Sequence, residues 1–208
     1  MQEKEKKYSP IEEFVNAFTH AIGTLMAIYG LVLLIVASKT PTQTTTTSIY
    51  GATLILLFQS STCYHAMVNE TAKKVFRKID HSAIFLLIAG TYTPILMLVV
   101  PFPHSVALLA VIWYLAAMGI VFSCITLKFK YLNTGLYLLM GWVSLFLICR
   151  MWAYSQTSVY LMLAGGLVYS FGCIFYLLKK LPFMHSIWHL FVLGGAILHY
   201  FSVMSLLK

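Results

Sequence analysis

Residues 105–127 read SVALLAVIWYLAAMGIVFSCITL and contain no charged side chain. A helix that crosses the hydrocarbon core of a bilayer needs about 20 consecutive apolar residues, and this stretch is long enough. Lipid offers the backbone no hydrogen-bond partner, so a spanning segment must be a helix or part of a closed barrel. The sequence lacks the strict alternation of apolar and polar residues that is typical of barrel strands. The stretch therefore predicts a membrane-spanning helix.

The rest of the chain has the same character. Of its 208 residues, 60% are hydrophobic and 10% are charged, whereas a soluble domain averages about 45–50% apolar and about 25% charged residues. This composition excludes disorder and argues against a soluble globular protein, because too few polar side chains are available to cover the surface. The formal net charge is +8. The basic residues lie in short gaps between apolar runs, however, so we expect no nucleic-acid partner.

Seven apolar runs are long enough to be membrane spans. They are residues 17–38, 48–68, 79–100, 105–127, 132–150, 158–178 and 184–207. The gaps between them are short, and they contain no linker and no detectable repeat. The sequence therefore predicts an all-α integral membrane protein. We expect a single domain over residues 1–208, built as a seven-transmembrane-helix bundle with a short cytoplasmic segment at residues 1–16.

The basic residues predict the orientation, because loops rich in Lys and Arg stay in the cytoplasm. One side has Lys4, Lys6, Lys7, Lys73, Lys74, Arg77, Lys78, Lys128, Lys130, Lys179 and Lys180. The other side has Lys39, Arg150 and Lys208. We therefore expect the N-terminus in the cytoplasm and the C-terminus outside, which requires an odd number of spans. No cleavable signal peptide is visible, and the expected location is the cell (plasma) membrane, as a multi-pass protein.

Histidines gather near the expected cytoplasmic ends of the spans. His185 and His189 are four residues apart, so their rings share one helix face and can hold one metal ion. His65 lies at the same depth at the end of another span. Three histidines with a fourth position open form the pattern of a catalytic zinc site rather than a closed structural one. The alternative is an interfacial hydrogen-bond cluster that holds the helix ends together.

Asp80 is the only aspartate and enters the bilayer at the same depth, where an ionisable residue indicates function by default. It could orient a ligand or bind the metal's water. Ser61, one turn before His65, is a weaker signal because serines in membrane helices commonly bond the i−4 carbonyl. His199 lies about 15 Å beyond His189 along the helix. That distance is too long for a shared metal, so we expect a buried, hydrogen-bonded histidine there.

Glu12, Asn16, His20 and Gly23 recur on one face of the first span. This face could form a polar lid over the histidines or mark a capped helix entry. We favour the capped entry, which is a purely structural role.

Several of these residues fall in stretches that resemble the hemolysin III family, the bacterial branch of the progestin and adipoQ (adiponectin) receptor family. The stretches are EEFVNAFTHAIG at 12–23, STCYH at 61–65, Asp80-His81 followed by AGTYTP at 89–94, and MHSIWHLFV at 184–192. Together they extend over nearly the whole chain, and they are specific as a set. One departure is that Met184 and Ser186 flank the first histidine of the pair, where related sequences often have Phe and Glu.

The resemblance implies a seven-helix bundle with a Zn²⁺ ion near the cytoplasmic face, held by His65, His185 and His189. It implies that Asp80 holds the zinc-bound water, with Ser61 beside it. In a ceramidase-like mechanism, Asp80 would act as the general base and Ser61 could bond the developing oxyanion. The resemblance implies no further cofactor. Some members of the wider superfamily resemble ceramidases, which hydrolyse lipid amides. A membrane lipid is therefore the expected substrate or ligand, entering sideways from the bilayer.

Three functions remain as hypotheses at this point. The first is a zinc-dependent hydrolase of lipid amides or esters. The second is a receptor-like or non-enzymatic protein that senses or adjusts membrane lipid composition and fluidity, in which zinc is structural. The third is a pore-forming cytolysin. It has the least support, because seven apolar spans are typical of a protein that stays in the membrane. Neither a protein partner nor an oligomeric state can be predicted from the sequence.

Overall fold

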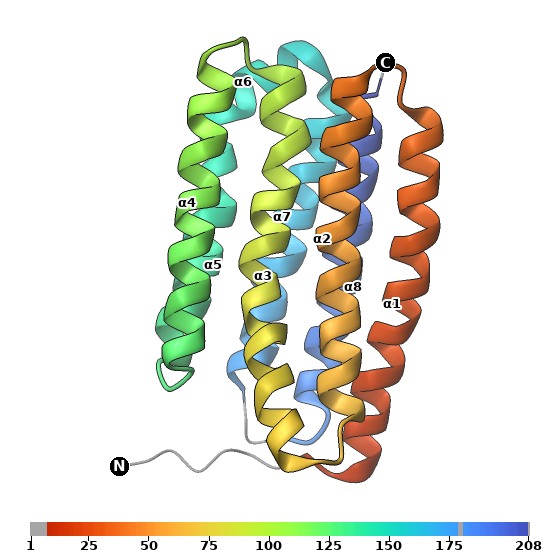
Figure 1. The fold of residues 1–208 in the computed structure, drawn as a ribbon, viewed down its shortest axis with the longest axis vertical. Helices are drawn as coiled ribbons and strands as arrows, with labels where there is room; N and C mark the ends of the chain where they lie inside the picture. Colours follow the sequence, from red (N-terminus) through yellow and green to blue (C-terminus); the bar gives the residue numbers. More distant parts are fainter. Residues whose placement is uncertain (1–7, 179–180, 208) are drawn as a thin grey trace.

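The computed structural model describes residues 8–178 and 181–207. These residues contain α-helices, one 3-10 helix and no strand, which confirms the all-α prediction. The α-helices are α1 (Pro10–Ala37), α2 (Pro41–Ala66), α3 (Glu70–Val99), α4 (His104–Ile125), α5 (Lys130–Trp142), α6 (Ile148–Tyr154), α7 (Gln156–Leu177) and α8 (Met184–Met204). The 3-10 helix, η1 (Val143–Leu147), joins α5 to α6. Figure 1 shows them as a bundle of upright rods.

The order of packing brings the first and the last helix together. α1 packs on α2, α2 on α3 and α3 on α4, while α8 contacts both α7 and α1. The start of α1, the end of α2, the start of α3 and the start of α8 all lie at the lower end of the bundle in Figure 1. The residues that the sequence analysis singled out are concentrated at this end.

Six helical segments among the described residues are long and apolar enough to cross a membrane. They are α1, α3, α4, the continuous segment Lys130–Tyr154, α7 and α8. α2 occupies the expected span 48–68 and has a similar length, but polar residues at 42–47 and 59–62 lower its hydropathy. Large apolar side chains such as Leu25, Val36 and Leu139 are exposed on the outside of the bundle. Apolar faces of this extent require lipid rather than water around them.

The expected fifth span is interrupted rather than continuous. α5 ends at Trp142 and is followed by η1 and α6. The hydroxyl of Tyr92, on α3, lies 2.9 Å from the carbonyl oxygens of both Met140 and Gly141. Ser144 Oγ also donates to the Gly141 carbonyl, at 3.0 Å. The two hydroxyls donate to carbonyl oxygens that, in a regular helix, would accept from backbone N–H groups. The carbonyls at the break therefore keep hydrogen-bond partners at membrane depth.

The first helix begins earlier than the hydropathy of the sequence predicted. Ser9 caps α1: its Oγ accepts from the Glu12 N–H at 3.2 Å, and its own N–H donates to Glu12 Oε2 at 2.9 Å. This reciprocal pair is a capping box, and Pro10 suits the first helical position. The described part of the segment expected at residues 1–16 is therefore mostly the first turns of α1. Of the basic residues used for orientation, Lys4, Lys6, Lys7, Lys179, Lys180 and Lys208 lie outside the described residues.

Candidate metal centre

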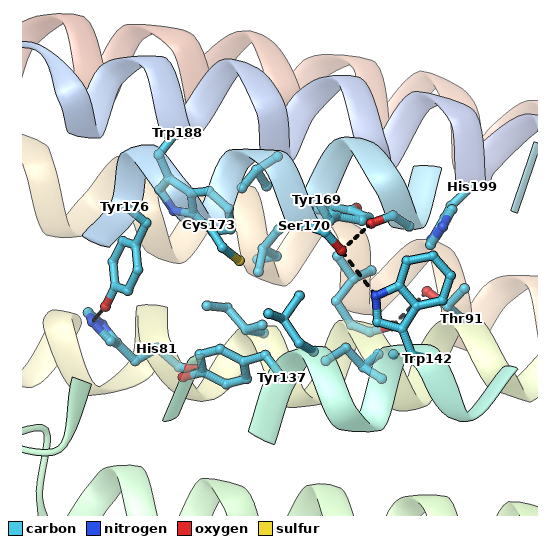
Figure 2. Close-up of a pocket in the computed structure, with 18 of the residues that line it drawn as sticks. His81, Thr91, Tyr137, Trp142, Tyr169, Ser170, Cys173, Tyr176, Trp188 and His199 are labelled. Carbon is cyan, nitrogen blue, oxygen red and sulfur yellow. Dashed lines mark hydrogen bonds between the residues drawn. The ribbon is translucent and has the colours of Figure 1, made fainter. Parts of the chain in front are cut away.

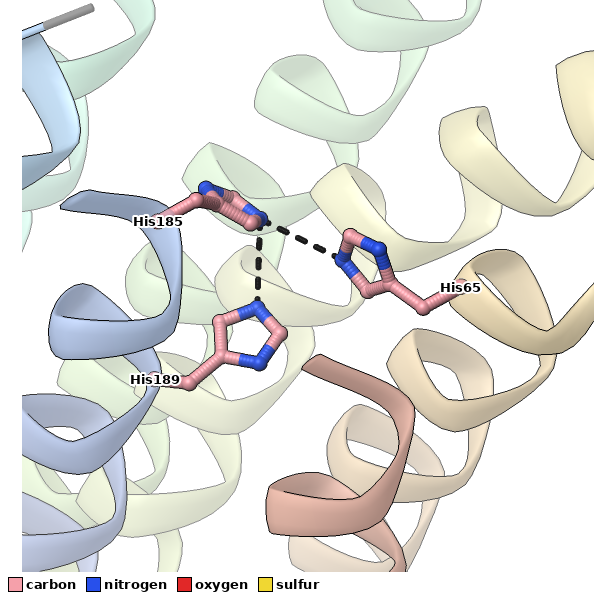
Figure 3. Close-up of side chains that lie close together, drawn as sticks. All are labelled: His65, His185 and His189. Atoms are coloured by element: carbon pink, nitrogen blue, oxygen red, sulfur yellow. Dashed lines mark hydrogen bonds between the residues drawn. The ribbon is translucent and has the colours of Figure 1, made fainter. Parts of the chain in front are cut away.

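Three imidazoles converge at the lower end of the bundle. His65 comes from the last turn of α2, and His185 and His189 come from the first turns of α8. One ring nitrogen of each lies within 4.8 Å of the other two. Figure 3 shows the rings pointing toward a common centre, with His185 Nε2 3.2 Å from the Nε2 atoms of both His65 and His189. The i, i+4 spacing places His185 and His189 on one face of α8, and the packing of the bundle brings the His65 ring of α2 to them.

The outer ring nitrogens of two of these histidines have fixed acceptors. His65 Nδ1 lies 2.6 Å from Glu13 Oε2, and His189 Nδ1 lies 3.1 Å from the backbone carbonyl oxygen of Asn16. A carbonyl or carboxylate oxygen can only accept, so in each pair the Nδ1 must carry the proton. In the neutral rings the Nε2 atoms of His65 and His189 therefore present lone pairs to the centre.

This proton count tests whether a cation fits. His185 Nε2 faces both lone pairs and can carry at most one proton, so one of the two 3.2 Å contacts has no hydrogen to place between the nitrogens. A cation at the centre would accept all three lone pairs. Two ligands at about 2.0–2.1 Å from a tetrahedral zinc ion lie roughly 3.3 Å apart, close to the separations here. The three residues thus fit a divalent ion, and imidazole nitrogens suit zinc among several metals.

Residues of α1 surround the imidazoles without belonging to the triplet. The ring of His20 stacks on that of His189, with centroids 3.6 Å apart and planes 13° from parallel. Asn16 Oδ1 accepts from Ser186 Oγ at 2.6 Å, so the residue that follows His185 binds the first helix. Glu12, the first residue of the polar face of α1, takes part in the helix cap with Ser9, as in the capped-entry interpretation. At Asn16 and His20 this face also covers the cluster, as the alternative interpretation proposed.

Tyr8 lies over the same cluster, just before α1. Its ring stacks on His185 with centroids 5.0 Å apart, and its centroid is 6.0 Å from that of His65. Burial, and then the negative charge of Glu13, raise the pKa of the Tyr8 hydroxyl well above its ordinary value. The hydroxyl therefore stays protonated at physiological pH.

An apolar cavity of about 150 Å³ runs from the histidines into the bundle. At one end it is lined by His185, His189, His20, Ser61 and Asp80. The structure thus brings both predicted catalytic residues to the same cavity wall as two of the predicted ligands. Asp80 Oδ2 lies 3.6 Å from the His81 Nδ1, and Ser61 Oγ is buried and has no hydrogen-bond partner among the described residues. A buried hydroxyl without a partner calls for a water or ligand atom.

Figure 2 shows the length of this cavity, with His81 and Tyr176 at one end and Trp142, Thr91 and His199 at the other. The lining also includes the apolar side chains of Leu87, Ile95 and Val192. His199 makes the hydrogen bond expected of it, from Nε2 to the Met162 carbonyl at 3.2 Å.

Sequence reasoning missed Glu13, Lys73 and Tyr8. The sequence analysis counted Lys73 only among the basic residues of the cytoplasmic side and gave Glu13 no role. In the structure, Lys73 Nζ lies 2.7 Å from Glu13 Oε1, and Glu13 Oε2 lies 2.6 Å from His65 Nδ1. The signal that was available is position: Glu13 precedes Asn16 by three residues and His20 by seven, so the three lie on neighbouring parts of one helix face. Tyr8 offered no such pattern.

Comparison with known proteins supports the resemblance found in the motifs. The sequence model of a family described as haemolysin-III related matches residues 8–200. The chain is 43% identical to hemolysin-3 of Bacillus cereus over 198 residues, which are 93% of this chain and 90% of that protein. It is 41% identical to a hemolysin-3 homolog of Bacillus subtilis, covering 93% of each chain. It is 31% identical to the human monocyte to macrophage differentiation factor, covering 95% of this chain and 86% of that one. The chain is thus a multi-pass membrane protein and belongs to the haemolysin-III-related family.

Proposed function

We propose that this protein is a zinc-dependent hydrolase of a membrane-lipid amide or ester. One observation carries the proposal: three imidazole nitrogens that can hold a cation lie close together, and two of these histidines line a largely apolar cavity that Asp80 also lines. A purely structural ion needs neither a cavity nor a carboxylate on the cavity wall. Three protein ligands also leave a fourth position of the ion for water or substrate.

His65, His185 and His189 would hold the ion. When bound, a divalent ion in such a site lowers the pKa of a water molecule and polarises a carbonyl group. Asp80 would accept the proton of that water at its carboxylate. Ser61 Oγ–H, which has no other acceptor among the described residues, would donate to the substrate oxygen as negative charge develops there.

The size of the cavity supports a lipid as the substrate. His189 and His199 both line it and are ten residues apart on α8, which corresponds to about 15 Å of helix rise. That is half of the ~30 Å hydrocarbon core, so the cavity is as long as an acyl chain in one leaflet. An apolar lining holds such a chain by burying its surface, at roughly 25 cal/mol per Å².

We propose further that all seven predicted spans, α2 among them, cross the membrane as one domain with the N-terminus in the cytoplasm. α2 packs against both α1 and α3. Half of the polar residues at 42–47 and 59–62 are buried there, namely Gln43, Thr46, Thr47, Ser60 and Ser61. Impermeant labelling of single cysteines introduced at Lys39 and Lys74 tests this topology in intact cells. Lys39 is expected to react from outside and Lys74 only after permeabilisation, and the reverse pattern would invert the orientation.

Metal content and turnover of the purified protein test the function. We expect about one zinc ion per chain by elemental analysis, together with release of fatty acid from a lipid amide or ester in vesicles, detected by mass spectrometry. Removing the ion with a chelator should abolish the release, and adding zinc back should restore it. A protein that carries no metal after purification and cannot be loaded with zinc, cobalt or manganese would rule the proposal out.

A further inference from the structure

The side chain of Glu13 contacts one of the three imidazoles and a lysine on a third helix. Glu13 Oε2 accepts from His65 Nδ1 at 2.6 Å, and Glu13 Oε1 accepts from Lys73 Nζ at 2.7 Å. The three residues come from α1, α2 and α3, respectively. Among the contacts described above, His65 is the member of the triplet whose outer nitrogen meets a carboxylate, whereas His189 meets a neutral carbonyl.

We propose that Glu13 is the positioning residue of the metal centre and acts through His65. The inference rests on the proposed metal site and adds to it a carboxylate–histidine pair. In metal sites such a pair fixes the tautomer and the orientation of the ring and increases the basicity of the nitrogen that faces the metal. Here the hydrogen bond from Nδ1 to Glu13 leaves the Nε2 lone pair of His65 directed at the two α8 histidines.

The environment of the pair distinguishes it from an ordinary surface contact. The side chain of His65 is fully buried, with an exposed fraction of 0%, while those of Glu13 and Lys73 are 18% and 23% exposed. An exposed ion pair contributes little free energy because water screens it. When a buried imidazole N–H loses its acceptor, by contrast, no hydrogen bond offsets the free-energy cost of its desolvation. Glu13 is therefore required to satisfy His65.

Lys73 holds the carboxylate from its other side. Its ammonium group also lies 3.4 Å from the carbonyl oxygen of Met67 and 5.4 Å from the centroid of the Tyr64 ring. Lys73 is thus anchored at the end of α2, beside His65. With each oxygen of Glu13 bound to a different partner, the carboxylate has one orientation, and so does the ring that donates to it.

The test is the zinc affinity of Glu13→Gln, measured by chelator competition on the metal-free protein in nanodiscs. Glutamine keeps the size of the side chain and removes its charge, so we expect zinc to bind about 10–100-fold more weakly. Glu70→Gln is the matched control: Glu70 begins α3 at the same end of the bundle and is exposed. Its substitution removes the same charge and should leave the affinity within about twofold.

A double-mutant cycle separates positioning from a general effect on packing. If Glu13 acts through His65, then adding Glu13→Gln to His65→Ala should cause no further loss of the residual zinc affinity. If Glu13 merely holds α1 in place, the further loss should persist, and the proposal is overturned. Thermal unfolding of the metal-free variants checks the fold. Should Glu13→Gln not fold, Lys73→Met, which leaves the hydrogen bond to His65 in place, is expected to weaken zinc binding by a smaller factor.

The outcomes also distinguish this inference from the proposed function. Tight zinc binding by the native protein with an unchanged affinity in Glu13→Gln would overturn the role of Glu13 and leave the metal site standing. A native protein that binds no zinc would remove both.

Discussion

Replacing His189 with alanine is expected to empty the metal centre. Zinc sites are worth about 10–16 kcal/mol of binding free energy, so one protein ligand out of three accounts for roughly 4 kcal/mol, a loss in affinity on the order of 10³-fold. The ring is buried, and its Nε2 faces the centre 3.2 Å from His185. Elemental analysis of the purified variant should therefore find little metal, and hydrolysis should be lost with it.

His199→Ala is the control for this result. His199 lies on the same helix and lines the same cavity, but its ring is bonded to the Met162 carbonyl rather than to the histidine cluster. This variant should keep its metal. If instead His189→Ala retained a full complement of zinc while folding normally, the ion would have to lie elsewhere, and the site assembled from α2 and α8 would be wrong.

Asp80→Asn is expected to separate metal binding from chemistry. Asparagine has nearly the same shape as aspartate but cannot take up a proton, and general base catalysis typically contributes 10²–10⁴-fold to a rate. Asp80 lines the cavity and is not one of the three clustered ligands. The variant should thus bind zinc as the native protein does and hydrolyse lipid about 10²–10⁴-fold more slowly.

Zinc content and lipid turnover have to be measured on the same preparation of Asp80→Asn. Unchanged turnover at full metal occupancy would exclude Asp80 as the base. Native protein that holds zinc but hydrolyses no lipid would favour the non-enzymatic role in lipid composition or fluidity, with a structural ion.

The apolar runs predicted where the helices are but not where they end. The expected third span starts at residue 79, whereas α3 starts at Glu70. The difference arises because hydropathy marks the part of a helix that lies in lipid, and the charged turns of α3 extend beyond it. The break between α5 and η1 could not be predicted, because its carbonyls are satisfied by Tyr92 from another helix.

The candidate site was predictable where its geometry is local. The spacing of His185 and His189 fixes their shared face, and the orientation of the spans placed His65 and Asp80 at the same depth. Glu13 was not predicted as part of the site, because a charge pattern does not distinguish a solvated carboxylate from one that is paired with residues of other helices. Its partners, His65 and Lys73, are 52 and 60 residues away in sequence.

The contact between α1 and α8 has a consequence for how the protein is made. His65 leaves the ribosome long before His185 and His189, and Asn16 and His20, which pack on His189, leave earlier still. Synthesis proceeds from the N-terminus, so the three-nitrogen pocket is complete only after the last helix has inserted and docked on the first. A nascent or truncated chain has no such pocket, and metal uptake would thus report that membrane insertion has finished.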